Sequence, residues 1–339
     1  MDTENNEIIE RYKNIAKKRT QIVTVFLTSS NRVKYIKDAI ESILDQDYTN
    51  FCFVILDNNS TDGTEEIIKS YIDERIFYIS RESKRDNPNF MFAFSICVTK
   101  YMVVFHDDDI VDRRYLSTML PIMEKDNIQI LSSSANVIDE SGQIVRRSQN
   151  NEGVYLGDEY FECFIKRNLK TNIWFPANMY QTDFYRDISN YFDLVGAGPA
   201  TDQYLLFQTG RYGGIVKIIP DCLLNYREHK SQGCSLMLGV MELQLIKYVK
   251  EDRYYDERIK KNKKYFHKYL ISAYKAFVVN YKRHGNASIR KQLKIDKSFY
   301  LDLGWKVYLM CWIYNFSYLF FRITIVPCAF LLTFRRNHE

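Results

Sequence analysis

Several short motifs that mark other classes of protein do not occur in this chain of 339 residues. No two of its seven cysteines have C-x-x-C spacing, which disfavours a zinc site, and their odd number disfavours a disulfide framework. No G-x-G-x-x-G follows the first apolar segment and no G-x-x-x-x-G-K-[ST] occurs, which disfavours dinucleotide binding and a P-loop enzyme. The cysteine pattern favours a reducing compartment.

The chain also lacks a secretory signal and an uninterrupted apolar run of the roughly 20 residues that a membrane-spanning helix needs. The aromatic and aliphatic segment 299–339 is interrupted by Asn315, Arg322 and Pro327, and a charge at Arg322 would be costly in the bilayer core. We therefore expect a cytoplasmic protein whose amphipathic tail lies on the inner face of the cell membrane. A buried C-terminal helix and a true membrane span are the alternatives.

Positive charge is concentrated in one part of the chain, although the net charge is only +5. Residues 251–300 contain 14 Lys and Arg against 5 Asp and Glu. A basic segment next to an aromatic tail points to an anionic partner, either membrane phospholipid or nucleic acid. No helix-turn-helix, zinc-finger or RNP pattern is present, so we expect a membrane surface and no nucleic acid. No pattern indicates an oligomeric state.

Strand-like and helix-like segments alternate in the first third of the chain. Apolar runs predict four buried strands, at residues 22–27, 51–56, 76–79 and 101–105. Helical spacing between the runs implies a parallel sheet covered by helices, in which ligands bind beyond the carboxyl ends of the strands. The helix expected after the second strand would bury Tyr71 and Ile72 on its inner face. We expect a polar extension at 1–20, an α/β domain at 21–235, a basic helical region at 236–298 and a membrane-associating tail at 299–339.

Three consecutive carboxylates, Asp107, Asp108 and Asp109, follow the fourth predicted strand. Desolvated carboxylates repel one another, and each is costly to bury without a partner. A divalent cation with hard oxygen ligands, Mg²⁺ or Mn²⁺, would resolve both problems. The alternative is a solvated loop in which Asp109 or Asp112 caps the next helix.

The order and spacing of four segments together resemble the family 2 glycosyltransferases of the GT-A fold. That family shows Pro-Thr-Tyr-Asn-Arg after its first strand, Ser-Ile/Leu-x-x-Gln-x-Tyr in the next helix, Asp-Asp/Asn-x-Ser-x-Asp-Gly-Thr after its second strand, and Asp-x-Asp-Asp. The similar segments here are residues 28–32, 42–48, 57–64 and 106–109. In two places the chain departs from the pattern, because His106 replaces the first Asp and Ser30 replaces an aromatic residue.

The resemblance implies a Rossmann-like domain that binds a nucleotide-diphosphate sugar, with UDP as the expected nucleotide. It implies that Asp57 contacts the base or ribose, and that Mn²⁺ or Mg²⁺ is held by Asp108 and His229. The implied donor-binding residues are Thr28, Ser30, Asn31, Arg32, Asp57, Asn58, Asp107 and Arg227. Arg227 and His229 lie in a segment similar to the family's Tyr-Arg-x-His, where they would supply charge, hydrogen bonds or a metal ligand near the departing diphosphate. Ordinary solvated charges are the alternative.

The resemblance also implies an inverting reaction whose base is a carboxylate at the start of a helix, and Asp202 fits that description. The base takes the proton of the acceptor hydroxyl as its oxygen attacks the anomeric carbon. The alternative is that Thr201 or Asp202 only caps the helix. Four residues between the metal motif and this base either stack on an acceptor sugar or pack in the core, and composition favours the core: Trp174, Phe175, Asn178 and Tyr180.

We therefore expect an inverting hexosyltransferase acting on a glycan or lipid-linked acceptor in polysaccharide biosynthesis. A sugar-nucleotide pyrophosphorylase is an alternative, but such an enzyme usually has a Gly-rich N-terminal loop, and residues 28–32 contain no Gly. A non-catalytic carbohydrate-binding or scaffold protein of the same fold is another alternative, for which His106 is the main argument. Donor hydrolysis would separate an enzyme from a binding protein.

Overall fold

The computed structural model describes residues 3–82, 88–147, 152–166, 173–188, 200–229, 240–266, 268–270 and 272–273. The chain divides into two units, Met1–Asn280 and Tyr281–Glu339, and every described residue lies in the first. The tail predicted at 299–339 lies outside the described residues. The described helices and strands are α1 (Thr3–Lys18), β1 (Val23–Ser29), α2 (Ile36–Leu44), β2 (Cys52–Asp57), α3 (Thr64–Lys69), β3 (Ile76–Ser80), α4 (Asn89–Ile96), β4 (Tyr101–His106), β5 (Ile110–Val111), α5 (Tyr115–Asp126), β6 (Ile130–Ile138), β7 (Ile144–Arg147), β8 (Gly153–Leu156), α6 (Glu159–Lys166), η1 (Phe175–Ala177), β9 (Asn178–Gln181), α7 (Thr182–Ile188), α8 (Thr201–Arg211), β10 (Ile215–Arg227), α10 (Val240–Glu251) and α11 (Arg253–Lys261).

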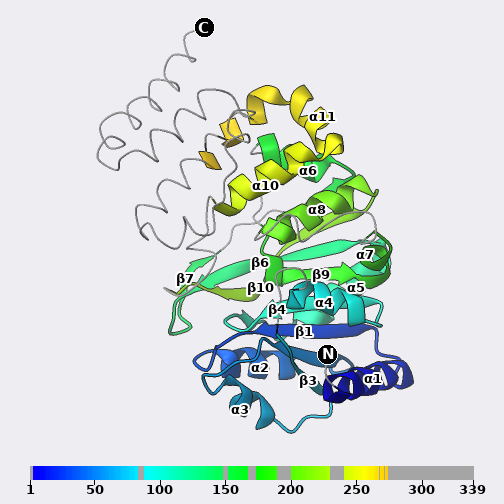
Figure 1. Ribbon diagram of the computed structural model, residues 1–339, viewed down its shortest axis with the longest axis vertical. Coiled ribbons are helices and arrows are strands. Elements are labelled where there is room, and N and C mark those ends of the chain that lie inside the picture. The colour runs from blue at the N-terminus through cyan, green and yellow to red at the C-terminus, as the bar shows by residue number, and fades with distance from the viewer. Residues whose placement is uncertain are drawn as a thin grey trace. The chain divides into compact units, whose positions relative to one another are not determined.

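The described strands form one twisted sheet that runs through the domain (Figure 1). Its order is β3-β2-β1-β4-β9-β6-β10-β5, with β7 beside β6 and β8 beside β10. The strands β3, β2, β1 and β4 are parallel, as the alternating pattern predicts. β9 is antiparallel to both β4 and β6, so the whole sheet is mixed, which differs from the mostly parallel sheet that we predict for the domain. Parallel neighbouring strands need long crossover connections. The strands β6 and β7 are joined by a short turn at residues 139–143 and are antiparallel.

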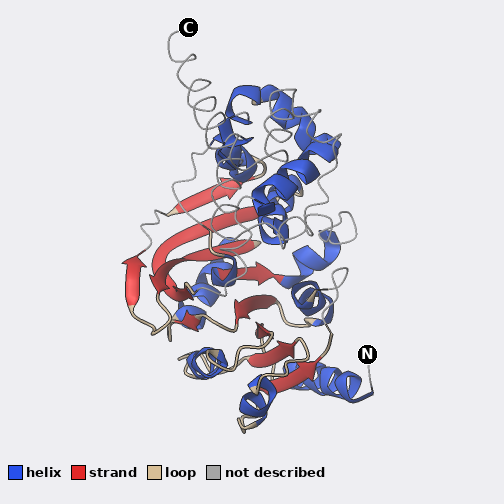
Figure 2. Ribbon diagram, turned by 60° about the vertical axis from the view of Figure 1, so that its left-hand side comes forward, coloured by secondary structure: helices blue, strands red, loops and turns tan. Residues whose placement is uncertain are grey.

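Helices cover the parallel part of the sheet on both faces, because side chains alternate between the two faces of each strand (Figure 2). On one face Val25 and Phe53 belong to a core shared with α2 and α5. On the other face Phe26 meets Tyr12 of α1, with ring centroids 6.5 Å apart. Residues 1–20 therefore include a helix packed against the sheet, where the sequence pattern predicts only a polar extension.

The helix α3 is shorter than its apolar pattern predicts. It ends at Lys69, and the chain turns at Asp73, whose carbonyl accepts the backbone N–H of Ile76 at the start of β3. Tyr71 still packs against the core from this turn, but Ile72 is fully exposed. The prediction that Ile72 lies on the inner face of a helix is wrong, because helical spacing beyond residue 69 is not realised.

The second half of the described chain contains a hairpin and further helices. A hairpin joins β6 and β7, and the carboxylate of Asp139 accepts the backbone N–H groups of Ser141 and Gln143 in its turn. In the region 236–298 the described residues include the helices α10 and α11. Among the described residues no helix is both long and apolar enough to cross a membrane.

Candidate active site

Three parallel strands end at one edge of the sheet and bring the predicted site residues together. In the strand register Ser29 of β1 lies opposite Asp57 of β2, and Thr28 lies opposite His106 of β4. The loops that follow these strands therefore meet at the carboxyl edge, where α/β proteins bind ligands.

Asp107 is buried and turns back towards the loop that follows β1. Its carboxylate accepts the backbone N–H of Ser30 at 2.9 Å and the Nε of Arg32 at 3.1 Å. Burial raises the pKa of Asp107 to about 7, and the charge of Asp108 adds to the rise, while the Arg32 guanidinium opposes it. The Arg32 guanidinium also lies 3.7 Å from the carboxylate of Asp108, so one arginine neutralises part of the acidic run.

Asp108 meets His229 across the site, with Nε2 of the imidazole 2.9 Å from Oδ2 of the carboxylate. The His229 ring also packs on Tyr35, at a centroid distance of 5.1 Å. The two residues that the family resemblance implies as metal ligands are therefore adjacent in space, although 121 positions separate them in the chain.

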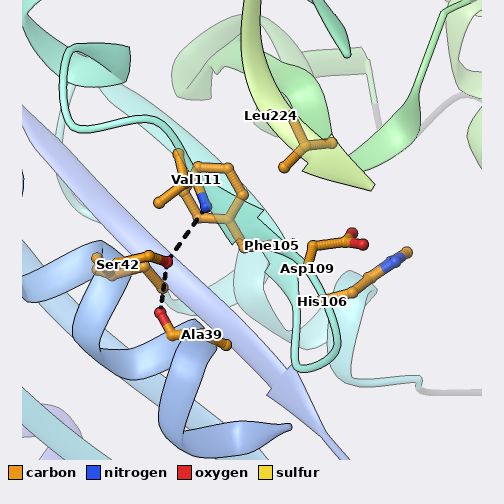
Figure 3. A pocket seen from close by; sticks show the side chains of 8 residues that line it. Ala39, Ser42, Phe105, His106, Asp109, Val111 and Leu224 are labelled. Atoms are coloured by element: carbon orange, nitrogen blue, oxygen red, sulfur yellow. Dashed lines mark hydrogen bonds between the residues drawn. The ribbon is translucent and has the colours of Figure 1, made fainter. Parts of the chain in front are cut away.

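Asp109 has one carboxylate oxygen without a partner. Its Oδ1 accepts the backbone N–H of Arg227 at 2.9 Å, whereas its Oδ2 is buried and unpaired. Burial, followed by the charge of Asp108, raises the pKa of Asp109 well above its usual value. Figure 3 shows this carboxylate directed to the side of His106 and away from Phe105 and Val111. Asp109 and these residues line one small gap that is too narrow for water.

Three residues of the acidic segment, Asp109 among them, fit a divalent cation. One ligand atom each of His106, Asp108 and Asp109 lies within 4.8 Å of the others. Burial lowers the pKa of His106, which favours the neutral imidazole that can donate a lone pair. A cation at this point would satisfy the unpaired oxygen of Asp109 and offset the repulsion between the carboxylates.

Arg227 is buried, and its guanidinium is held within the protein. Its Nε donates to the carbonyl of Asp108 at 2.8 Å, and its two Nη atoms donate to the carbonyl of Glu140 at 3.1 Å and to the carboxylate of Asp38 at 2.9 Å. The guanidinium also lies over the ring of Tyr35, 4.8 Å from its centroid. Arg227 therefore braces the turn that carries the acidic run, whatever contact it makes with a ligand.

The loop after β2 is organised around Asp57. The carboxylate of this fully buried residue accepts the backbone N–H of Ser60 at 2.9 Å and the hydroxyl of Tyr78 at 3.2 Å. Asn31, whose φ of 51° is left-handed, donates its backbone N–H to the Ser60 hydroxyl and accepts the N–H of Thr61. These bonds join the loops after β1 and β2 into one surface.

The remaining predicted donor residues lie at the same junction. The backbone N–H of Asn58 donates to the carbonyl of Ser29 at 2.8 Å, and its side chain reaches the hydroxyl of Ser30 at 3.5 Å. Thr28 Oγ1 lies 3.4 Å from the carbonyl of Phe105 in the neighbouring strand. The predicted donor-binding residues therefore form one contiguous group along the carboxyl edge.

Asp202 lies in the first turn of α8. The N-cap residue of α8 is Ala200, and Asp202 accepts the N–H of its own neighbour Gln203 at 2.7 Å, so it does not occupy the cap position. Burial raises the pKa of Asp202 to about 6. The charge of Asp202 also contributes to the raised pKa of Tyr180, a residue of β9, although burial is the larger cause.

The four aromatic and amide residues between the metal motif and α8 pack within the domain. Tyr180 and Asn178 are buried in β9, and Phe175 stacks on His106 with ring centroids 5.7 Å apart. Trp174 packs against Tyr226 of β10 at 4.7 Å. Core packing is thus the main structural role of these residues, as composition indicates.

Three residues at the site have no place in the predicted ligand sets: Tyr35, His106 and Asp109. His106 directly precedes the acidic run and Asp109 ends it, and this adjacency to Asp108 in the sequence is a signal that could have found both residues. No local pattern marks Tyr35, because its contacts with His229 and Arg227 depend on a segment nearly 200 positions away.

Known proteins resemble this chain over the part that carries the acidic run. The sequence model of the glycosyl transferase family 2 matches residues 24–188. An uncharacterized glycosyltransferase of Methanocaldococcus jannaschii is 33% identical over 153 residues, which cover 44% of this chain and 52% of that protein. The glycosyltransferase GlyA of Streptococcus pneumoniae is 25% identical over 211 residues, which cover 60% of this chain and 27% of that protein. The chain thus spans about half or less of these relatives.

Solved structures share the fold at low sequence identity. S. aureus TarS 1-349 in complex with UDP superposes with a TM-score of 0.57 at 15% identity, covering 84% of this chain and 82% of that one. The mannosyltransferase PcManGT from Pyrobaculum calidifontis, in complex with GDP-Man and Mn²⁺, has a TM-score of 0.52 at 16% identity, covering 88% of each chain. Residues 24–188 are thus similar to the glycosyl transferase family 2, and the shared fold shows that the chain is built on the GT-A fold.

Proposed function

We propose that this protein is an inverting glycosyltransferase that moves a sugar from a nucleotide-diphosphate sugar to a hydroxyl of a glycan or lipid-linked acceptor. The observation that carries the proposal is the acidic run at the carboxyl edge, with its buried and unpaired Asp109 Oδ2. A carboxylate that lacks a partner beside two further carboxylates and a neutral imidazole is suited to a cation that also binds phosphate oxygens.

The donor would lie along the edge formed by the loops after β1 and β2. Thr28, Ser30, Asn31 and Asn58 line this edge beside the proposed position of the base and ribose, and Asp57 holds the loop after β2. UDP is the nucleotide we propose, and the relatives of known structure bind UDP or GDP-Man. Arg32 would place positive charge beside the diphosphate, next to Asp107 and Asp108.

Mn²⁺ or Mg²⁺ would be held by Asp108 with His106, Asp109 or His229. When bound, the ion supplies positive charge that stabilises the departing diphosphate. The chain's own contribution is to fix the ligands: Arg227 anchors the carbonyl of Asp108 and the carboxylate of Asp109, and His229 orients the second oxygen of Asp108.

Asp202 is the proposed general base. Its pKa of about 6 leaves it ionised at neutral pH yet basic enough to accept a proton from a hydroxyl that is attacking the anomeric carbon. A single displacement of this kind inverts the anomeric configuration.

The test is a screen of nucleotide sugars with the purified protein, with and without Mn²⁺. We expect metal-dependent donor hydrolysis or transfer that excess EDTA abolishes and that added Mn²⁺ restores. Asp108→Asn should lose this activity, whereas Asp139→Asn, a carboxylate in the exposed hairpin turn, should retain it. No turnover of any nucleotide sugar would favour a binding or scaffold protein, and nucleotide-sugar synthesis from a sugar phosphate would favour a pyrophosphorylase.

We also propose that the protein works at the inner face of the cell membrane, close to a lipid-linked acceptor. The basic composition of residues 251–300 and the aromatic tail at 299–339 support this proposal. Peripheral attachment does not require a spanning helix. Nucleic acid is not a proposed partner.

A further inference from the structure

Two polar side chains, Ser42 in α2 and Gln46 two residues beyond the end of that helix, reach the segment that follows the acidic run. We infer that Gln46, assisted by Ser42, is a positioning residue that fixes Asp108 and Asp109 for the cation. This inference rests on the metal site of the proposed function. It gives a physical role to the Ser-Ile-x-x-Gln segment at 42–46, for which the sequence indicates no chemistry.

Gln46 is almost fully buried, at 3% exposure, and both ends of its amide are bonded. Its Nε2 donates to the carbonyl of Asp112 at 2.8 Å and to the carbonyl of Ser42 at 3.2 Å. Its Oε1 accepts the backbone N–H of Leu116, in the first turn of α5, at 3.0 Å. One side chain therefore holds both the end of β5 and the start of α5.

Ser42 makes a second connection one helical turn earlier. Figure 3 shows its hydroxyl between Ala39 and Val111: it donates to the carbonyl of Ala39 at 2.9 Å and accepts the backbone N–H of Val111 at 3.2 Å. Val111 is two positions from Asp109. Ser42 and Gln46 thus bond to backbone groups from Val111, next to the acidic run, to Leu116.

The strand β10 holds the same segment from another direction. Leu224 pairs with Val111 in an antiparallel register, and the N–H of Asp112 donates to the carbonyl of Leu223 at 2.9 Å. The strand β5 has only the two residues Ile110 and Val111, so its backbone bonds alone give a short anchor. Because like charges at 107–109 push the turn apart, the side-chain bonds of Gln46 and Ser42 are needed to keep its ligand atoms in place.

The experiment compares two buried glutamines whose side-chain amides each make three hydrogen bonds, one near the carboxyl edge of the sheet and one near the opposite edge. Gln129 also has a fully bonded amide: it donates to the carbonyl of Asn127 at 3.0 Å and to the side chain of Gln181 at 2.9 Å, and it accepts the N–H of Ile215 at 2.8 Å. Gln129 precedes β6 and Ile215 opens β10, so this bridge lies away from the carboxyl edge. Gln46→Met and Gln129→Met each remove these bonds at similar side-chain size and without a change in charge.

Mn²⁺ affinity is measured by calorimetry on the full-length protein without donor, and the free energy of unfolding is measured in parallel. Loss of a group that supports a metal ligand typically weakens metal binding about 10- to 100-fold, and we expect that range for Gln46→Met. Gln129→Met should bind Mn²⁺ as the unsubstituted protein does, despite a comparable loss of stability. If Gln46→Met does not fold, Ser42→Ala, which removes a single hydroxyl, should weaken Mn²⁺ binding less than tenfold but measurably.

Equal Mn²⁺ affinity in Gln46→Met, or in Ser42→Ala, and the unsubstituted protein would overturn the positioning role while leaving the metal site intact. Equal weakening by Gln46→Met and Gln129→Met would also overturn it, because the effect would then follow stability. Absence of Mn²⁺ binding in the unsubstituted protein would overturn the metal site of the proposed function, and the inference with it.

Discussion

At the scale of single residues, Arg227 differs from a surface arginine because its side chain is buried and bonded within the protein. It combines an ion pair with Asp38, bonds to carbonyls of two loops and a stacking contact with Tyr35. A planar guanidinium fork can make all of these contacts at once, whereas an ammonium group cannot. The surroundings therefore select arginine over lysine at this position.

Arg227→Lys should lower the free energy of unfolding by about 2–3 kcal/mol, because buried carbonyls lose their donors. The matched control is Arg146→Lys, since Arg146 forms an exposed pair with Glu228 at 2.9 Å and its replacement should change stability by less than about 0.5 kcal/mol. Denaturant titration of both variants measures the difference. Similar small effects in both would show that the bonds of Arg227 do not stabilise the fold.

Ionisation of Asp202 should have opposite effects on turnover and on stability. A base must be ionised, so turnover should fall as the pH drops through about 6, the raised pKa of this carboxyl. The pKa is higher in the folded state than the ordinary value of 3.8, so the contribution of Asp202 to stability is fully present below 3.8 and is lost as the pH rises through about 6.

Asp202→Asn should therefore reduce turnover about 10²- to 10⁴-fold and yet raise the free energy of unfolding at pH 8, by an amount on the order of 1–3 kcal/mol. The gain should disappear near pH 3, below the ordinary value of 3.8, where the aspartate is largely protonated in both states. Activity assays and denaturant titrations at both pH values check the two parts. Near-normal turnover would exclude Asp202 as the base, and an unchanged or lower stability at pH 8 would mean that its burial carries no cost.

At the scale of elements, the contact between α8 and the turn before α6 depends on Gly210. A Cβ atom added at this position would lie 1.9 Å from the carbonyl oxygen of Gly157. The helix and the turn would therefore have to move apart. Alanine normally favours a helix interior over glycine by about 1 kcal/mol, and here the clash reverses that preference. The close approach also sets the position of α8, which carries Asp202 in its first turn.

Gly210→Ala should cost about 3 kcal/mol or more in stability and lower turnover as well. Gly213→Ala is the control: this glycine has a φ of 77° and no atom within 4 Å of an added Cβ, so only backbone strain of about 1–2 kcal/mol is expected. Thermal unfolding and donor turnover of the two variants separate the two effects. Equal destabilisation would show that the helix and the turn adjust freely.

At the scale of the whole molecule, the uneven charge leads to a prediction about membrane binding. Exposed lysines near the end of α11, such as Lys261 and Lys264, belong to the basic segment 251–300. Each basic residue near an anionic surface contributes on the order of 1 kcal/mol, and salt screens the attraction beyond about 10 Å at 0.1 M. The full-length protein should therefore co-sediment with phosphatidylserine-containing vesicles at low salt and dissociate at high salt.

Vesicles of phosphatidylcholine alone are the control and should bind far less protein. Binding that is equal for neutral and anionic vesicles, or that salt does not weaken, would point to insertion of apolar side chains as the main attraction. Absence of binding to anionic vesicles at low salt would contradict the proposed membrane surface.

Much of the parallel sheet could be predicted from the sequence, because the signals for it are local. An apolar run of five or six residues followed by helical spacing predicts a strand and the helix after it. Successive units of this kind pair their strands in parallel, which places the carboxyl ends of the strands at one edge of the sheet. That reasoning correctly brings Asp57 and the run at 106–109 to the same edge. It fails at Ile72, where the apolar spacing continues but the helix does not.

The sequence by itself determined which strands are buried and where the carboxylates emerge, since alternation and spacing act over a few residues. Only the tertiary structure decided that β9 inserts between β4 and β6, that Arg227 is buried behind the acidic run, and that Asp109 keeps one oxygen unpaired. These outcomes depend on contacts between segments as far as 189 positions apart, as in the pair of Arg227 and Asp38. No short-range pattern specifies such pairs, because they form only when the whole sheet has packed.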